Sequence, residues 1–224
     1  MDGLTKKKII EQFETNKRSH GGLHYTIPSP DTYPYQWFWD SCFHAITLSY
    51  FDPERAKDEL RLLLKGQFKN GMFPHIIYWQ RVAHSQFPDI HWGKRHTSSI
   101  TQPPVLAAAV WRIFEATGDE DFVRQMLPHI HAFHRYLFAN RDPKNLNLVG
   151  VINPDETGED NSPRYDYVLG LTDPRHLFVD NFRARLQLVD DWRQSHRPFL
   201  RQGRGALRRR VVRLRGRRRA DPRG

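Results

Sequence analysis

The segment DPERAKDELRLLLKG, residues 52–66, carries the full pattern of a helix that faces a hydrophobic core. Asp52 is suited to cap the helix N-terminus, and Pro53 fits the first helical position, where no N–H is needed. Apolar residues then recur at helical spacing at Ala56, Leu60, Leu63 and Leu64. We therefore predict a helix from Pro53 through about residue 67 that buries this stripe.

The same periodicity recurs in the flanking sequence. Residues 39–51 predict a helix with apolar positions at Trp39, Phe43, Ile46 and Tyr50. Another helix should follow Pro103 and Pro104 and end at Gly118, with an inward stripe at Leu106, Val110 and Ile113. Residues 119–140 repeat the pattern, with a kink expected at Pro128 and a stripe at Phe122, Met126, Ile130, Phe133 and Leu137.

With further helices expected near 4–18 and 175–193, the chain has about six helices and little strand-like alternation. Short turns alternate with long loops at 19–38, 68–102 and 141–174, and the unusual residues lie in the long loops. This pattern favours an all-α fold of paired helices around an axis, with a site at the loop end.

The net charge of +10 comes from the C-terminal segment. Residues 193–224 hold thirteen Arg and one acid, whereas residues 1–192 carry a net charge of −2. We predict a near-neutral folded unit at 1–192 and an Arg-rich tail at 193–224. The tail is either a disordered extension that binds anions or RNA non-specifically, or the product of a truncated or frame-shifted gene.

The cysteine content and the apolar runs indicate the compartment. Cys42 is the only cysteine, so no internal disulfide is possible, and its apolar neighbours favour a buried structural role. The N-terminus lacks a secretory signal, and the longest apolar run, at 105–111, is too short to span a membrane. We expect a cytoplasmic protein that does not contact a membrane.

The stretch YPYQWFWDSCF, residues 33–43, combines six aromatic rings with Gln36 and Asp40. Aromatic walls with a few polar groups are typical of a small-molecule pocket, and aromatic rings stack on sugar faces. Trp37 and Trp39 could also simply fill core volume. Two further segments, GMFPHIIYW (71–79) and TSSITQPP (97–104), contribute Tyr78, Trp79 and Gln102 at loop-to-helix junctions.

Neither a metal ion nor a cofactor is expected. His129, His131 and His134 lie at i, i+2 and i+5, so one helix cannot direct all three at one ion. Four carboxylates crowd into residues 155–160, yet this stretch lacks the register of a calcium loop. Such crowding also suits a carboxyl group that is kept protonated for proton transfer.

Four motifs, YPYQWFWDSCFHA, GMFPHIIYW, SSITQPPVLAA and ETGEDNSPRYD, occur in this order over about residues 20–180. Together they closely resemble the mannosylglycerate and glucosylglycerate hydrolases, which are related to the processing α-glucosidases of glycoside hydrolase family 63. The resemblance implies an (α/α)6 barrel of six helical hairpins, incomplete in this chain, and hydrolysis of an α-glycoside with inversion.

The resemblance also implies roles for individual residues. Asp160 would be the general acid, with its pKa raised by Glu156 and Glu159. The sugar subsite would be lined by Tyr33, Trp37, Trp39, Asp40 and Gln102, with Tyr78 on the aglycone side. This chain departs from the family pattern at Asp155, where relatives usually carry Trp, and at Asn153, where they often carry His.

We therefore expect the N-terminal half of an inverting α-glycosidase acting on a small glycosylglycerate-like carbohydrate. In the family the catalytic base is a Glu in the second half of the barrel, so this chain should be inactive alone. One alternative is a sugar-binding pseudoenzyme without the base. Another is a nucleic-acid-binding protein that uses the Arg tail, which is disfavoured because no aromatic residue is interleaved with the Arg run.

Overall fold

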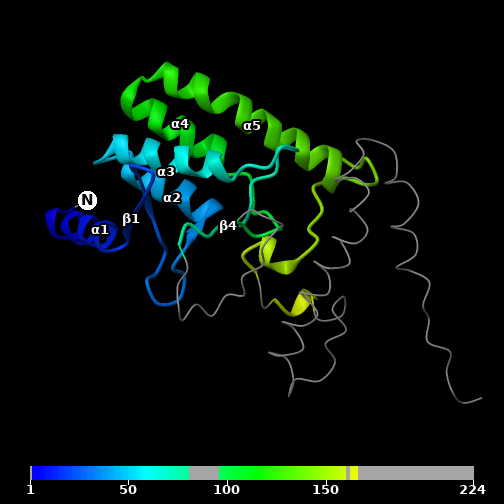
Figure 1. Cartoon of the computed structure of the whole chain (residues 1–224), viewed down its shortest axis with the longest axis horizontal. Helices are drawn as coiled ribbons and strands as arrows, with labels where there is room; N and C mark the ends of the chain where they lie inside the picture. Colours follow the sequence, from blue (N-terminus) through cyan, green and yellow to red (C-terminus); the bar gives the residue numbers. More distant parts are fainter. Residues whose placement is uncertain (1, 81–95, 160–161, 166–224) are drawn as a thin grey trace, which may run out of the picture.

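The computed structural model describes residues 2–80, 96–159 and 162–165. This part of the chain forms a helical core in which α2 contacts both α3 and α4, and α4 contacts α5. Figure 1 shows these four helices layered beside one another, with the N-terminal helix at one end. The helices are α1 (Gly3–Thr15), α2 (Phe38–Leu48), α3 (Pro53–Gly66), α4 (Leu106–Thr117) and α5 (Glu120–Arg141).

The helix boundaries follow the capping residues in the sequence. The Asp52 carboxylate accepts a hydrogen bond from the Arg55 backbone N–H at 3.1 Å, and α3 starts at Pro53 as predicted. Helix α4 ends at Gly118, which adopts a left-handed φ of 68°. Asp119 then caps α5 by accepting from the Phe122 N–H at 2.9 Å. Helix α5 continues through Pro128 as one element.

The stripes predicted for α3, α4 and α5 meet in one hydrophobic core, in which only Leu64 and Ile130 of these stripes are partly exposed. Aromatic rings fill its centre. Phe38 stacks on Phe73 with ring centroids 5.0 Å apart, and Phe133 contacts both rings edge-on at 5.3 Å. The periodicity of these three helices is therefore confirmed.

The stripe predicted for α2 is confirmed at Trp39 and Ile46, which pack partly buried against the core, and wrong at Phe43 and Tyr50, which are 49% and 67% exposed. The helix begins one residue earlier than predicted, at Phe38. Helix α2 contacts both α3 and α4. The face that it buries is formed by Phe38, Ser41, Cys42, Ala45 and Leu48.

A β-hairpin replaces the end of the first predicted helix and the start of the predicted loop 19–38. Strands β1 (Lys17–His20) and β2 (Leu23–Thr26) pair antiparallel, with His20 opposite Leu23. Gly21 and Gly22 form the two-residue turn, with φ of 58° and 79°. Both positive values match the turn type that two-residue hairpins prefer, so α1 must end at Thr15 to leave room for β1.

A second small sheet joins β3 (Gln36–Trp37) to β4 (Ile76–Ile77). Over the described residues, the fold is thus a helical core with two short antiparallel sheets and two 3-10 turns, η1 (Pro154–Glu156) and η2 (Pro163–Tyr165). No helix in the described part of the chain is both long and apolar enough to cross a membrane. The helix predicted near 175–193 and the boundary at 192/193 lie outside the described residues.

Candidate functional site

Two of the predicted site residues, Trp39 and Asp40, lie at the start of α2. Strand β3 leads directly into α2. The Phe38 N–H donates to the His75 carbonyl at 3.0 Å, and this hydrogen bond holds the first residue of the helix in place. The next amide, of Trp39, donates to the side-chain oxygen of Gln102 at 3.0 Å. Trp39 and Gln102, 63 positions apart in the sequence, are therefore in direct contact.

Asp40 follows in the first turn of α2 and is partly buried. Burial raises the pKa of its carboxyl group to about 6, although hydrogen bonds from its own backbone N–H and from the Trp39 side chain partly oppose the shift. Asp40 is thus mostly ionised at neutral pH and protonated in mild acid. An ionised carboxylate beside an indole ring is suited to accept hydrogen bonds from sugar hydroxyls.

The acidic loop is held against this helix start. Gly158 has a left-handed φ of 72°, and a Cβ built on it would lie 2.4 Å from Cη2 of Trp39. Only a residue without a side chain permits this approach. Three of the four motif segments, the ones that carry Trp39, Gln102 and Gly158, therefore converge at one place.

Two of the four carboxylates of the acidic loop have an arginine partner. Glu156 is buried and accepts two hydrogen bonds from Arg141, both at 2.7 Å. Glu159 pairs with Arg164 at 2.7 Å on the exposed side. Each arginine offsets part of the negative charge of the loop, and the expected effect of Glu156 and Glu159 on the pKa of Asp160 stays a prediction. Asp160 itself lies outside the described residues.

The remaining aromatic candidates form a small buried cluster. Trp37 and Tyr78 are 5% and 6% exposed and belong to a cluster completed by Tyr35 and Ile76. The Tyr78 and Tyr35 rings meet edge-on, with centroids 4.7 Å apart. Tyr33 is 41% exposed and packs edge-on against Trp37 at 5.4 Å. Of the three candidates Tyr33, Trp37 and Tyr78, only Tyr33 presents substantial surface to a ligand.

Sequence reasoning missed a buried polar group behind the site. The Ser41 hydroxyl donates to the Glu59 carboxyl group at 2.6 Å, and the Gln36 amide donates to the Glu59 carbonyl at 3.0 Å. The Gln36 oxygen accepts from the Trp79 indole at 2.7 Å, so Gln36 serves the fold. Complete burial raises the pKa of Glu59 to about 8. The sequence did carry a signal of this buried group, because Glu59 lies on the apolar face of α3, beside Ala56 and Leu60.

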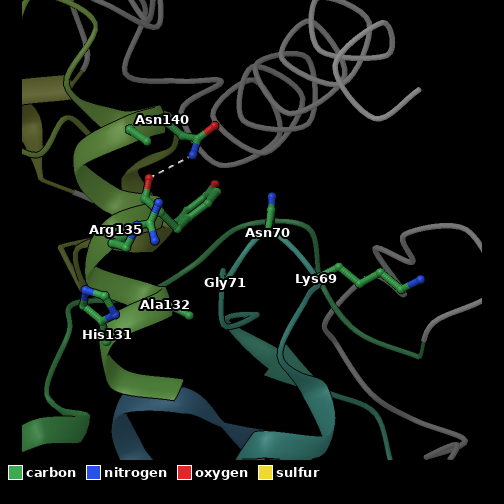
Figure 2. Close-up of a pocket in the computed structure, with 9 residues that line it drawn as sticks. Lys69, Asn70, Gly71, His131, Ala132, Arg135 and Asn140 are labelled. Atoms are coloured by element: carbon green, nitrogen blue, oxygen red, sulfur yellow. Dashed lines mark hydrogen bonds between the residues drawn. The ribbon is translucent and has the colours of Figure 1, made fainter. Parts of the chain in front are cut away.

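A cavity of about 320 Å³ lies between α5 and the turn at 69–71. Lys69, His131 and Arg135 are among the residues that line it. Figure 2 shows Lys69 extending away from α5, so the Lys69 and Arg135 side chains do not converge on one point. In the described ranges, no three His, Cys, Asp or Glu side chains are grouped so that they could hold a metal ion.

The chain is similar to known glycoside hydrolases. The family model of the mannosylglycerate hydrolase MGH1-like glycoside hydrolase domain matches residues 33–223. Mannosylglycerate hydrolase MGH1 of Selaginella moellendorffii is 41% identical over 154 residues, which are 65% of this chain and 31% of that protein. Mannosylglycerate hydrolase of Thermus thermophilus is 39% identical over 170 residues, 71% of this chain and 40% of that protein.

Among solved structures, a family 63 mannosylglycerate hydrolase of Thermus thermophilus, in complex with Tris and D-glycerate, has a TM-score of 0.74 at 34% identity. The match covers 88% of this chain and 52% of that chain. The chain belongs to the mannosylglycerate hydrolase MGH1-like glycoside hydrolase family. It spans about half the length of the solved relative and less than half that of the curated relatives it matches.

Proposed function

We propose that this chain is part of a glycoside hydrolase that cleaves the α-glycosidic bond of a glycosylglycerate with inversion. The observation that carries the proposal is the convergence of Trp39, Gln102 and Gly158, which brings the acidic loop onto the aromatic start of α2. Similarity to mannosylglycerate hydrolases supports the substrate class.

In this proposal the sugar contacts Trp39, Asp40, Gln102 and Tyr33, whereas Trp37 and Tyr78 form the wall behind them. The Trp39 ring would stack on the sugar face, and Asp40 would accept hydrogen bonds from hydroxyl groups. Asp160, two residues beyond Gly158, would protonate the leaving oxygen.

Inversion also needs an ionised carboxylate that activates water from the opposite face, roughly 6.5–9.5 Å from the acid. Among the described carboxylates at this site, Glu156 and Glu159 are each held by an arginine, Asp40 is assigned to the sugar, and Asp155 lies in the loop that carries the proposed acid. We therefore propose that residues 1–224 bind substrate but do not hydrolyse it.

The helix pairs α2–α3 and α4–α5, each joined by a short turn, are consistent with hairpins of an (α/α)6 barrel. We propose that residues 1–192 form the N-terminal part of such a barrel. The family match continues to residue 223, across the Arg-rich segment at 193–224.

Calorimetry with mannosylglycerate and glucosylglycerate tests the site. We expect the wild type and Asp160→Asn to bind, and Trp39→Ala to lose at least about tenfold in affinity because the stacking surface is removed. The matched control is Trp111→Ala, since Trp111 is 58% exposed on α4. Absence of binding by the wild type would contradict the proposal.

An assay for the release of free sugar tests whether this chain lacks the catalytic base. Hydrolysis by the 224-residue chain that Asp160→Asn abolishes would show that the base is present, while supporting Asp160 as the acid. The intact mass of the protein from its native source distinguishes the enzyme from the alternative of a sugar-binding pseudoenzyme. A mass near 26.5 kDa favours a binding protein, and roughly twice that mass favours the enzyme.

A further inference from the structure

The Arg141–Glu156 pair links two segments of the candidate site. Arg141 is the last residue of α5, and Glu156 is the last residue of η1. Both side chains are 2% exposed, and the guanidinium donates one hydrogen bond to each carboxylate oxygen at 2.7 Å. The planar fork of arginine fixes the orientation of the carboxylate as well as its charge.

The Glu156 carboxylate also accepts from two backbone amides. Oε1 accepts from the Thr101 N–H at 3.1 Å, and Oε2 accepts from the Ile152 N–H at 2.9 Å. Thr101 belongs to the segment that carries Gln102, whereas Ile152 belongs to the acidic loop. One side chain therefore joins both segments and satisfies an amide of each.

The next contacts along these segments reach the proposed sugar residues. Gln102, adjacent to Thr101, accepts from the Trp39 N–H at 3.0 Å. Gly158, two residues after Glu156, lies against the Trp39 ring. The acidic loop is thus fixed at Glu156 and again at Gly158, just before Asp160.

A buried ion pair is by itself weak evidence for stability, because desolvation offsets its attraction. An apolar pair of similar volume could fill this space, but it could not accept hydrogen bonds from the Thr101 and Ile152 amides. The hydrogen bonds from these two amides fix the positions of the two backbone segments relative to each other. Such precision matters at an active site, where reactive groups must be held to within a fraction of an ångström.

We propose that Glu156 is a positioning residue: oriented by Arg141, it sets the spacing between the loop that carries Asp160 and the Gln102–Trp39 sugar contacts. This role rests on the proposed function. Glu156 does not touch the substrate and acts through the two backbone segments that it joins.

The test uses Glu156→Asp in the full chain. Aspartate keeps the charge beside Arg141 but is one methylene shorter, so it cannot keep both amide contacts and the ion pair. The matched control is Glu14→Asp, because Glu14 also pairs with a buried arginine, Arg55, at 2.6 Å. Glu14 lies in α1 and contacts none of the site residues described above.

Three quantities are measured for each variant: melting temperature, hydrogen exchange at the Thr101 and Ile152 amides, and affinity for mannosylglycerate. We expect Glu156→Asp to exchange both amides faster and to bind at least about tenfold more weakly at a temperature where it is folded. Glu14→Asp should keep both the exchange rates and the affinity of the wild type.

Wild-type affinity in Glu156→Asp, with faster exchange at the two amides, would overturn the positioning role and leave the proposed function intact. A wild type that binds no glycosylglycerate would overturn both. If Glu156→Asp does not fold, Arg141→Lys replaces it, because lysine cannot hold both carboxylate oxygens in a fixed plane. Unchanged affinity and amide exchange in folded Arg141→Lys would then overturn the proposal.

Discussion

Gly158 lies against the indole of Trp39 so closely that a Cβ at this position would be 2.4 Å from Cη2 of the ring. This contact joins the acidic loop to the start of α2, and no side chain can be accommodated without moving one of the two.

Gly158→Ala should therefore separate the loop from Trp39. The substitution combines an unfavourable left-handed φ, which costs roughly 1–2 kcal/mol, with a clash against a partly buried ring. Gly118→Ala is the matched control, because Gly118 has a φ of 68° and a Cβ there would meet no atom within 4 Å. Chemical denaturation should show a larger loss of unfolding free energy for Gly158→Ala, and equal losses would argue against the contact.

Glu59 should make the protein less stable as the pH rises. Its folded pKa of about 8 lies above the ordinary value of 4.5. Between pH 4.5 and 8, the native state therefore keeps a proton on Glu59 that the unfolded state has lost. The free energy of unfolding should then fall by at most about 1.4 kcal/mol per pH unit.

Comparison with Glu59→Gln between pH 6.5 and 8 isolates this effect. Burial lowers the pKa of His44 to about 4 and of His75 to about 3, so proton loss from these two residues in the unfolded state raises the stability of both proteins equally as the pH rises. Denaturation at several pH values should give a slope that is more negative for the wild type than for Glu59→Gln. Parallel slopes would show that Glu59 does not titrate there.

Asp40 should make ligand affinity depend on pH. Because its pKa is about 6, the acceptor form is lost as the pH falls from 7 to 5. Calorimetry with mannosylglycerate in an Asp160→Asn background should show affinity about tenfold weaker at pH 5 than at pH 7. Adding Asp40→Asn should remove this dependence, and a persisting dependence would assign it to another group.

Cys42 should be inert in the folded protein. It is fully buried, and burial raises the pKa of its thiol well above the ordinary value, which disfavours the reactive thiolate. A thiol reagent should label it only as fast as the protein unfolds, so adding denaturant should speed labelling steeply. Labelling at the rate of a free cysteine under native conditions would contradict its burial.

Much of the helical core could be predicted because its signals are local. The cap at Asp52 and the glycine at 118 are read from neighbouring residues, and the stripes of α3, α4 and α5 follow from 3.6-residue periodicity. The hairpin at 17–26 was missed, although the Gly21–Gly22 pair was a visible turn signal.

The sequence by itself determined where α3, α4 and α5 begin and end and which segments carry the unusual polar and aromatic residues. Only the tertiary structure decided which face of α2 is buried, because that depends on how α3 and α4 pack against it. It also decided that Glu156 is neutralised by Arg141 and bonded to Thr101, 55 positions away. Such pairings leave no periodic trace, because they depend on distances that exist only after the helices have packed.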